Sequence, residues 1–146
     1  PPFSLLNLRS QIGEPSRLKG HPTILVFAYG HCKTVCPTLL HNSVSAARVS
    51  RAPLVIIGLD PWRDNCGSWQ NIAKGWELPE GAEVWTGSPE QTLVATKAFG
   101  VPCQRDQMTG EITHPGLVFL LNSQAQIAYR FNNPSSEWIL QGLDRL

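Results

Sequence analysis

The stretch VFAYGHCKTVCPTLL, residues Val26 to Leu40, decides the fold of this chain. It begins with an apolar segment typical of a buried strand and continues into a short polar turn. The turn carries two cysteines four positions apart, Cys32 and Cys36, and Pro37 follows the second one directly. Proline is favoured at the start of a helix, because the amide hydrogen that it lacks has no intrahelical partner there. The pattern therefore predicts a strand, a loop and a helix, with Cys36 as the N-cap residue.

The predicted position of these two thiols favours their ionised form. A thiol at a helix start faces backbone N–H groups without helical partners and the positive end of the helix dipole. Two thiolates held together in this way suit either a redox pair or part of a soft-metal site. The alternative is that Cys32 and Cys36 form a disulfide that only stabilises the fold.

Two more cysteines, Cys66 and Cys103, lie far apart in the sequence. A zinc ribbon would need two close cysteine pairs, and this second pair is spread too widely for that. An oxidising compartment would permit a second disulfide between them. Two separate buried thiols are the other interpretation.

The composition is that of a soluble globular domain. The chain has 146 residues, of which 42% are hydrophobic and 16% charged, and we expect one domain over residues 1–146. The net charge of +1, without runs of like charge, indicates no nucleic-acid tract and no polybasic membrane patch. The longest apolar runs have strand length and cannot span a bilayer. The start Pro1-Pro2-Phe3 lacks the features of a signal peptide, so we expect that any targeting segment or anchor has been trimmed away.

Strand and helix patterns alternate along the chain, after an N-terminal hairpin. Residues 88–91, Ser-Pro-Glu-Gln, form a clear helix start with a capping box, and residues 101–113 are polar and predicted to be an irregular loop. The expected strands are 23–29, 53–59, 81–86, 117–121 and 126–131, and the expected helices begin at Pro37, near Trp69, at Pro89 and at Asn133-Pro134. This order predicts an α/β, thioredoxin-like fold: a central, mostly parallel sheet with a C-terminal antiparallel hairpin and helices on both faces.

Four stretches of the chain resemble the signature of the Sco/SenC family of copper proteins. FAYGHCKTVCPTLL is similar to the family's Cys-x-x-x-Cys-Pro site, LDPWRDN (residues 59–65) to its Asp-Pro-x-Arg-Asp loop, and WTGSPEQ (residues 85–91) to its Thr-Gly-x-x-Glu-Gln helix start. THPGLVFLLN (residues 113–122) lies where the family has a histidine before a strand. Thr113 and Pro115 stand where the family usually has Asp and Ser, which removes a carboxylate partner for His114.

The resemblance implies copper as the cofactor, with Cys32, Cys36 and His114 as its ligands. It also implies an extracytoplasmic protein, periplasmic or in the mitochondrial intermembrane space, held to the membrane by an anchor absent from this chain. Its implied role is assembly of the CuA centre of cytochrome c oxidase. The implied partners are a cytochrome c oxidase subunit or another cuproprotein, together with a thioredoxin-like reductant, and no nucleic acid.

The donor types agree with copper chemistry. Copper(I) is soft and prefers thiolate, and imidazole is a suitable third donor for either oxidation state. A thiol-disulfide oxidoreductase, in which Cys32 attacks and Cys36 resolves, is the competing function, so enzymatic activity stays open. Dedicated thioredoxin-type enzymes have two residues between the cysteines, and the third one here makes room for a metal. A cysteine peroxidase is a third possibility, which the paired cysteines and the placed histidine disfavour.

Other side chains are weaker candidates. His31 adjoins Cys32 and is positioned to tune its charge, whereas His21 and His41 are expected to face solvent. Met108, the single methionine, is either a surface residue or a soft thioether for copper in transit. Trp62 and Trp85 are expected to line the site or a docking surface.

Overall fold

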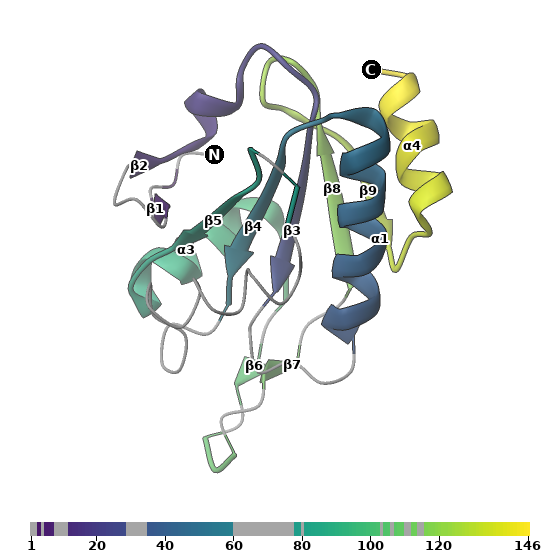
Figure 1. Ribbon diagram of the computed structural model, residues 1–146. Coiled ribbons are helices and arrows are strands. Elements are labelled where there is room, and N and C mark those ends of the chain that lie inside the picture. The colour runs from purple at the N-terminus through teal and green to yellow at the C-terminus, as the bar shows by residue number, and fades with distance from the viewer. Residues whose placement is uncertain are drawn as a thin grey trace.

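The fold is built on one seven-stranded sheet with helices packed on it (Figure 1). The computed structural model describes residues 3, 5–7, 12–28, 35–59, 78–79, 81–102, 104–105, 107–109, 112–113 and 116–146. Its elements are β1 (Leu5–Asn7), β2 (Ile12–Gly13), the short 3-10 helix η1 (Pro15–Leu18), β3 (Thr23–Ala28), α1 (Val35–Ser50), β4 (Leu54–Gly58), β5 (Glu83–Thr86), α3 (Pro89–Phe99), β6 (Gln104–Arg105), β7 (Ile112–Thr113), β8 (Leu117–Leu121), β9 (Ile127–Asn132) and α4 (Ser136–Asp144).

The strands of the sheet follow the order β2-β1-β5-β4-β3-β8-β9. The three central strands β5, β4 and β3 are parallel, and every residue of β3 and β4 is buried, as expected where both faces of a sheet are covered. β8 pairs antiparallel with β3 and forms a hairpin with β9, which confirms the predicted C-terminal hairpin. The N-terminal β1 and β2 also pair antiparallel, so the sheet as a whole is mixed.

Helices cover both faces of this sheet. Phe119 of β8 meets Phe99 of α3 edge to face, with ring centroids 5.0 Å apart. The next residue of β8, Leu120, lies against Gly142 of α4. Because neighbouring residues of a strand point to opposite faces, α3 and α4 lie on opposite sides of the sheet. Figure 1 shows α1 beside α4. This arrangement confirms the predicted thioredoxin-like α/β fold.

Helix α1 begins earlier than predicted. It starts at Val35, so Cys36 is its second residue and not the N-cap residue, and Pro37 is its third. A proline is tolerated there because the first four amide groups of a helix have no intrahelical acceptor. Leu40, Val44 and Ala47, predicted as the core face of this helix, are buried.

The predicted start of α3 is confirmed, whereas the predicted cap of α4 is wrong. The capping box of α3 is present: the Gln91 amide donates to Ser88 Oγ at 3.1 Å, and the Ser88 amide donates to Gln91 Oε1 at 2.9 Å. The N-cap of α4 is Ser135, whose hydroxyl accepts from the Trp138 amide. Asn133-Pro134 therefore precedes the cap and does not form it. The helix predicted near Trp69 lies outside the described residues.

The N-terminal hairpin packs against a tryptophan of the central sheet. Trp85 of β5 is completely buried, and Gly13 of β2 lies so close to its indole that a Cβ atom there would be 2.5 Å from Cδ2. Phe3 also packs against this ring, with centroids 6.2 Å apart. The expectation that Trp85 lines a site or docking surface is wrong, because the hairpin makes it a core residue.

Candidate metal centre

The carboxyl ends of the central strands meet at one edge of the sheet. Ala28, the last residue of β3, pairs with Gly58, the last residue of β4, and the Leu59 amide donates to the Ala28 carbonyl at 2.8 Å. Loops that leave this edge are the usual location of binding sites in α/β folds. The cysteine-containing loop follows β3, and the LDPWRDN stretch follows β4.

The antiparallel strand β8 brings a third part of the chain to the same edge. Val118 pairs with Val26, so β8 begins beside the end of β3. Gly116, just before β8, is buried, and its carbonyl accepts from the Asn133 amide at 2.6 Å. His114 lies two residues before Gly116 in the sequence. The structure therefore places the start of β8 at the edge where the cysteine-containing loop begins, and His114 itself lies outside the described residues.

Helix α1 contributes Cys36 from its first turn. That turn holds no acidic residue, so no carboxylate of the helix opposes the positive end of its dipole. The amide groups of a first helical turn lack intrahelical acceptors and stabilise a nearby anion. The backbone of this helical turn is therefore an environment that suits an anion.

Several predicted site residues lie outside the described part of the chain: Cys32, His114, His31, Cys66, Cys103 and Trp62. Among the residues that the structure does describe, no group of three or more His, Cys, Asp or Glu side chains could hold a metal ion. His21 and His41 are exposed, as predicted. The described helices include none that is long and apolar enough to cross a membrane.

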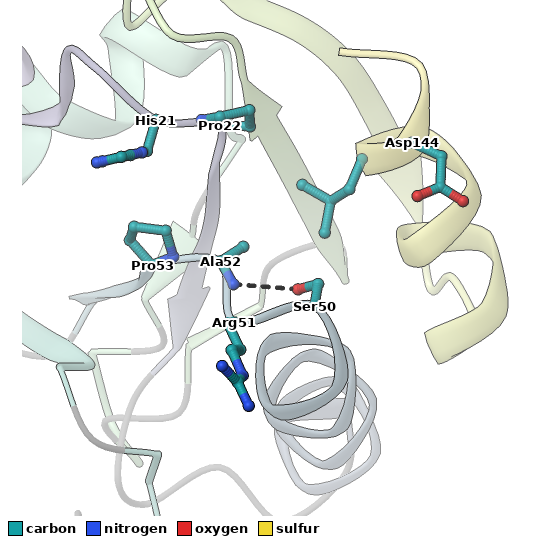
Figure 2. A pocket seen from close by; sticks show the side chains of 8 residues that line it. His21, Pro22, Ser50, Arg51, Ala52, Pro53 and Asp144 are labelled. Atoms are coloured by element: carbon teal, nitrogen blue, oxygen red, sulfur yellow. Dashed lines mark hydrogen bonds between the residues drawn. The ribbon is translucent and has the colours of Figure 1, made fainter.

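A hollow of about 420 Å³ lies at the opposite end of the sheet. It is lined by His21, Pro22, Ser50, Arg51, Ala52, Pro53, Leu143 and Asp144. Some of these residues lie in the last turns of α1 and α4, and the others lie between α1 and β4 or just before β3. The hollow is therefore at the other end of α1 from Cys36. Figure 2 shows that the side chains of His21, Arg51 and Asp144 do not point toward a common centre. This hollow therefore has no constellation of acid, base and nucleophile.

The structure also contains a feature that the sequence patterns did not reveal. Residues 101–113, predicted as an irregular loop, include the strands β6 and β7, which pair antiparallel as a separate two-stranded sheet. Strands of two residues are too short for alternation of polar and apolar residues to identify them. Figure 1 shows this hairpin projecting at the end of the molecule where α1 begins.

A protein-family model described as SCO1/SenC matches residues 1–143. The chain belongs to the SCO1/SenC family. This match covers every described strand and helix, up to the next-to-last residue of α4. The family assignment therefore applies to the sheet, its helices and the loops at the candidate site. It confirms the resemblance read from the four sequence stretches.

Individual SCO1/SenC relatives agree with this assignment. The chain is 28% identical to mouse (Mus musculus) "Protein SCO2 homolog, mitochondrial", over 98% of this chain, and it spans 60% of the length of that relative. The crystal structure of Arabidopsis thaliana ScoI with copper bound superposes with a TM-score of 0.88 at 23% identity, covering 99% of this chain and 95% of that one. BsSco, described as a member of the Sco family of cytochrome c oxidase assembly proteins with a disulfide switch, superposes with a TM-score of 0.81 at 17% identity, covering 99% and 90%.

Proposed function

We propose that this protein is an extracytoplasmic copper-binding protein that holds copper through Cys32, Cys36 and His114 and delivers it to a cuproenzyme. The CuA site of cytochrome c oxidase is the proposed acceptor. The observation that carries the proposal is the position of Cys36 in the first turn of α1, at the sheet edge where β3 ends and β8 begins. Residues 1–146 are proposed to form one domain of a protein that is tethered to a membrane.

The proposed donor set fits copper in a transfer protein. Two thiolates satisfy copper(I), which tolerates two-coordinate binding, and a neutral imidazole adds the nitrogen that copper(II) needs. A site with only three protein donors leaves copper accessible to the ligands of an acceptor. The bound ion is cargo here, so the site must release it as well as hold it.

Named relatives support both the metal and the role. ScoI of Arabidopsis thaliana was crystallised with copper bound, and BsSco belongs to a family described by its part in cytochrome c oxidase assembly. The mouse relative is mitochondrial. These properties belong to those proteins, and they favour copper delivery outside the cytoplasm over an unrelated use of the same fold.

The direct test is copper binding by reduced, purified protein. We expect about one copper per chain and, for copper(II), a thiolate-to-metal charge-transfer band in the visible spectrum. Cys32→Ser or Cys36→Ser should abolish copper retention, because a serine hydroxyl is hard and stays protonated. Cys66→Ser and Cys103→Ser are the matched controls and should retain copper. A Cys36→Ser variant that held stoichiometric copper(I) against a competing thiol would contradict the two-thiolate site.

A second function, thiol-disulfide exchange, is favoured by the disulfide switch named for BsSco. In this reaction the Cys32 thiolate attacks a partner's disulfide, forms a mixed disulfide and releases one partner thiolate. Cys36 then attacks the Cys32 sulfur, which forms the Cys32–Cys36 disulfide and releases the second partner thiolate, so two electrons pass to the partner. Cys36→Ser should trap the mixed disulfide on a non-reducing gel, and absence of any trapped partner would favour copper transfer alone.

A further inference from the structure

Strand β9 forms one edge of the seven-stranded sheet, beside β8 (Figure 1). Its sequence, IAYRFN, holds neither proline nor lysine, the residues that often protect such an edge from pairing with another chain. A register shift between Leu120 and Leu121 interrupts the ladder near Ile127, whereas residues 129–132 pair regularly with β8. Among the described strands, none pairs with the outer side of β9. Residues 129–132 therefore present a regular edge with which another strand can pair.

The side chains of this edge differ on the two faces of the sheet. Arg130 pairs with Phe119, which packs on α3, so Arg130 lies on the α3 side, where it is exposed. Tyr129 and Phe131 lie on the α4 side and stack, with ring centroids 5.9 Å apart and an interplanar angle of 9°. Trp138 of α4 extends this aromatic row: its ring centroid is 6.3 Å from that of Phe131, and it is 60% exposed.

The regular part of β9 lies near the end of the sheet that carries the proposed copper site. Phe131 pairs with Val118, and Val118 pairs with Val26 of β3, so the three residues form one line across the sheet. The cysteine-containing loop begins after Ala28, at the end of β3. Neighbouring strands are about 4.8 Å apart, so a strand added to β9 would lie about 15 Å from β3. A protein bound at this edge is therefore close to the proposed site.

We propose that β9 is the docking edge for the protein that receives the copper, and that an extended segment of this acceptor pairs with β9 as an additional strand. This inference rests on the proposed copper-delivery function. In the added strand, alternate side chains would face the aromatic row, and the others would face Arg130. The segment that fits is one in which apolar or aromatic residues alternate with Asp or Glu.

The charges at the edge favour this acidic pattern. Arg130 is the only charged residue of β9, and no acidic side chain of the described residues is paired with it. Glu137, which precedes Trp138 on α4, is exposed on the side of the aromatic row, so a partner's acidic side chains are disfavoured there. A second copy of β9 is a poorer occupant. The antiparallel register that pairs Tyr129 with Phe131 places the Arg130 side chains of the two copies directly opposite each other.

A synthetic peptide tests the docking edge directly. The probe is a short acetylated and amidated peptide in which Val or Tyr alternates with Glu, and the control peptide has Lys in place of Glu. Binding to ¹⁵N-labelled protein is followed by NMR, together with hydrogen exchange of the β9 amides. We expect the Glu peptide to protect alternate amides of β9, those that point away from β8. The Lys peptide should bind about fivefold more weakly.

Substitutions on the two faces of β9 should have different effects. Arg130→Glu should weaken binding of the Glu peptide by about fivefold and strengthen binding of the Lys peptide. Lys19→Glu, at an exposed position before β3, makes the same charge change and should bind as wild type does. Trp138→Ala should weaken both peptides by about fivefold, because it shortens the aromatic row. Its matched control is Leu93→Ala, at an exposed apolar position of α3 on the other side of the sheet.

Docking on β9 should affect copper transfer and leave copper binding unchanged. With the copper-free CuA domain of cytochrome c oxidase as acceptor, below saturation, Arg130→Glu should transfer copper(I) about fivefold more slowly than wild type. It should bind as much copper as wild type, and Lys19→Glu should match wild type in both measurements. The transfer is a ligand exchange, in which copper keeps its +1 state while its bonds to this protein are replaced by bonds to the acceptor.

The results distinguish failure of the docking edge from failure of the copper site. Absence of β9 protection by the Glu peptide, with wild-type transfer by Arg130→Glu, would overturn the docking edge and leave copper binding standing. Protection of β9 that rises with protein concentration, without peptide, would show a second copy at this edge and also overturn the proposal. Protection by the Glu peptide in a wild-type protein that binds no copper would overturn copper delivery and support strand pairing at β9.

Discussion

Val26 of β3 and Val118 of β8 face one another in an antiparallel ladder, which brings the start of β8 to the end of β3. The register matters because the two strands approach the candidate site from opposite chain directions. β3 runs into the loop that holds Cys32, and the chain reaches β8 from His114. The register thereby places the end of β3 and the start of β8, about ninety positions apart in the sequence, at one edge of the sheet.

Replacement of the histidine should separate copper(II) binding from copper(I) binding. We expect His114→Ala to lose most copper(II) affinity and the coloured band, because copper(II) requires a nitrogen donor besides thiolate. Copper(I) should still bind, more weakly, through the two thiolates, and Cys32–Cys36 disulfide formation should persist. Titration with each ion, with thiol oxidation measured separately, tests these expectations.

His41→Ala is the matched control for this experiment, because His41 is exposed on α1 and is not a proposed ligand. It should bind both copper ions as wild type does. Full copper(II) affinity and an unchanged spectrum in His114→Ala would remove His114 from the ligand set.

The remaining two cysteines are expected to form a second disulfide. Cys66 and Cys103 are not part of the proposed copper site, and an oxidising compartment permits a bridge between them. Intact mass after alkylation without reduction should show no free thiol once Cys32 and Cys36 are oxidised. Two alkylated thiols per chain would show instead that Cys66 and Cys103 remain reduced.

Gly13 should be intolerant of a larger residue. In Gly13→Ala the new Cβ would lie 2.5–2.9 Å from atoms of the buried Trp85 indole, so the hairpin or the ring must shift. We expect a loss of about 1–3 kcal/mol in the free energy of unfolding, measured by denaturant titration. Ile12→Ala, at a position 55% exposed, should change stability far less. Equal effects of the two substitutions would argue against the close packing.

The α3 cap offers a second stability test. Ser88→Ala removes the hydroxyl that accepts from the Gln91 amide, and the expected cost is about 1 kcal/mol in the free energy of unfolding. Ser123→Ala changes the same residue type in an exposed turn and should be close to neutral. A neutral Ser88→Ala variant would mean that water replaces the cap without loss.

Much of the fold was predictable because several local signals agree. The buried runs that became β3, β4 and β8 are continuous and apolar, and Ser88 with Gln91 marks the start of α3 unambiguously. The predicted starts of helices that lack such a capping box were less exact. Cys36 was placed at the N-cap because Pro37 suits N1, yet proline is tolerated throughout the first turn and the helix starts at Val35.

Residues whose environment depends on distant chain segments were harder to predict. Nothing next to Trp85 in the sequence shows that Gly13, more than seventy positions earlier, will lie against its indole. The same holds for the β6–β7 hairpin, whose strands are too short to leave a pattern. The donor types of the proposed site could be named from residue types and spacing, whereas the proximity of the β3 end and the β8 start required the register of β8 on β3.

The pairing of β1 with β5 has a consequence for the order in which the chain can fold. Leu6 and Asn7 pair with Thr86 and Trp85, so the N-terminal hairpin cannot take its place in the sheet until the chain is complete to β5. Contacts this distant in sequence form slowly, because a long loop must close first. During synthesis β1 therefore lacks its β5 partner until residues 83–86 have been made, and a chain truncated before residue 83 would leave β1 without that neighbour.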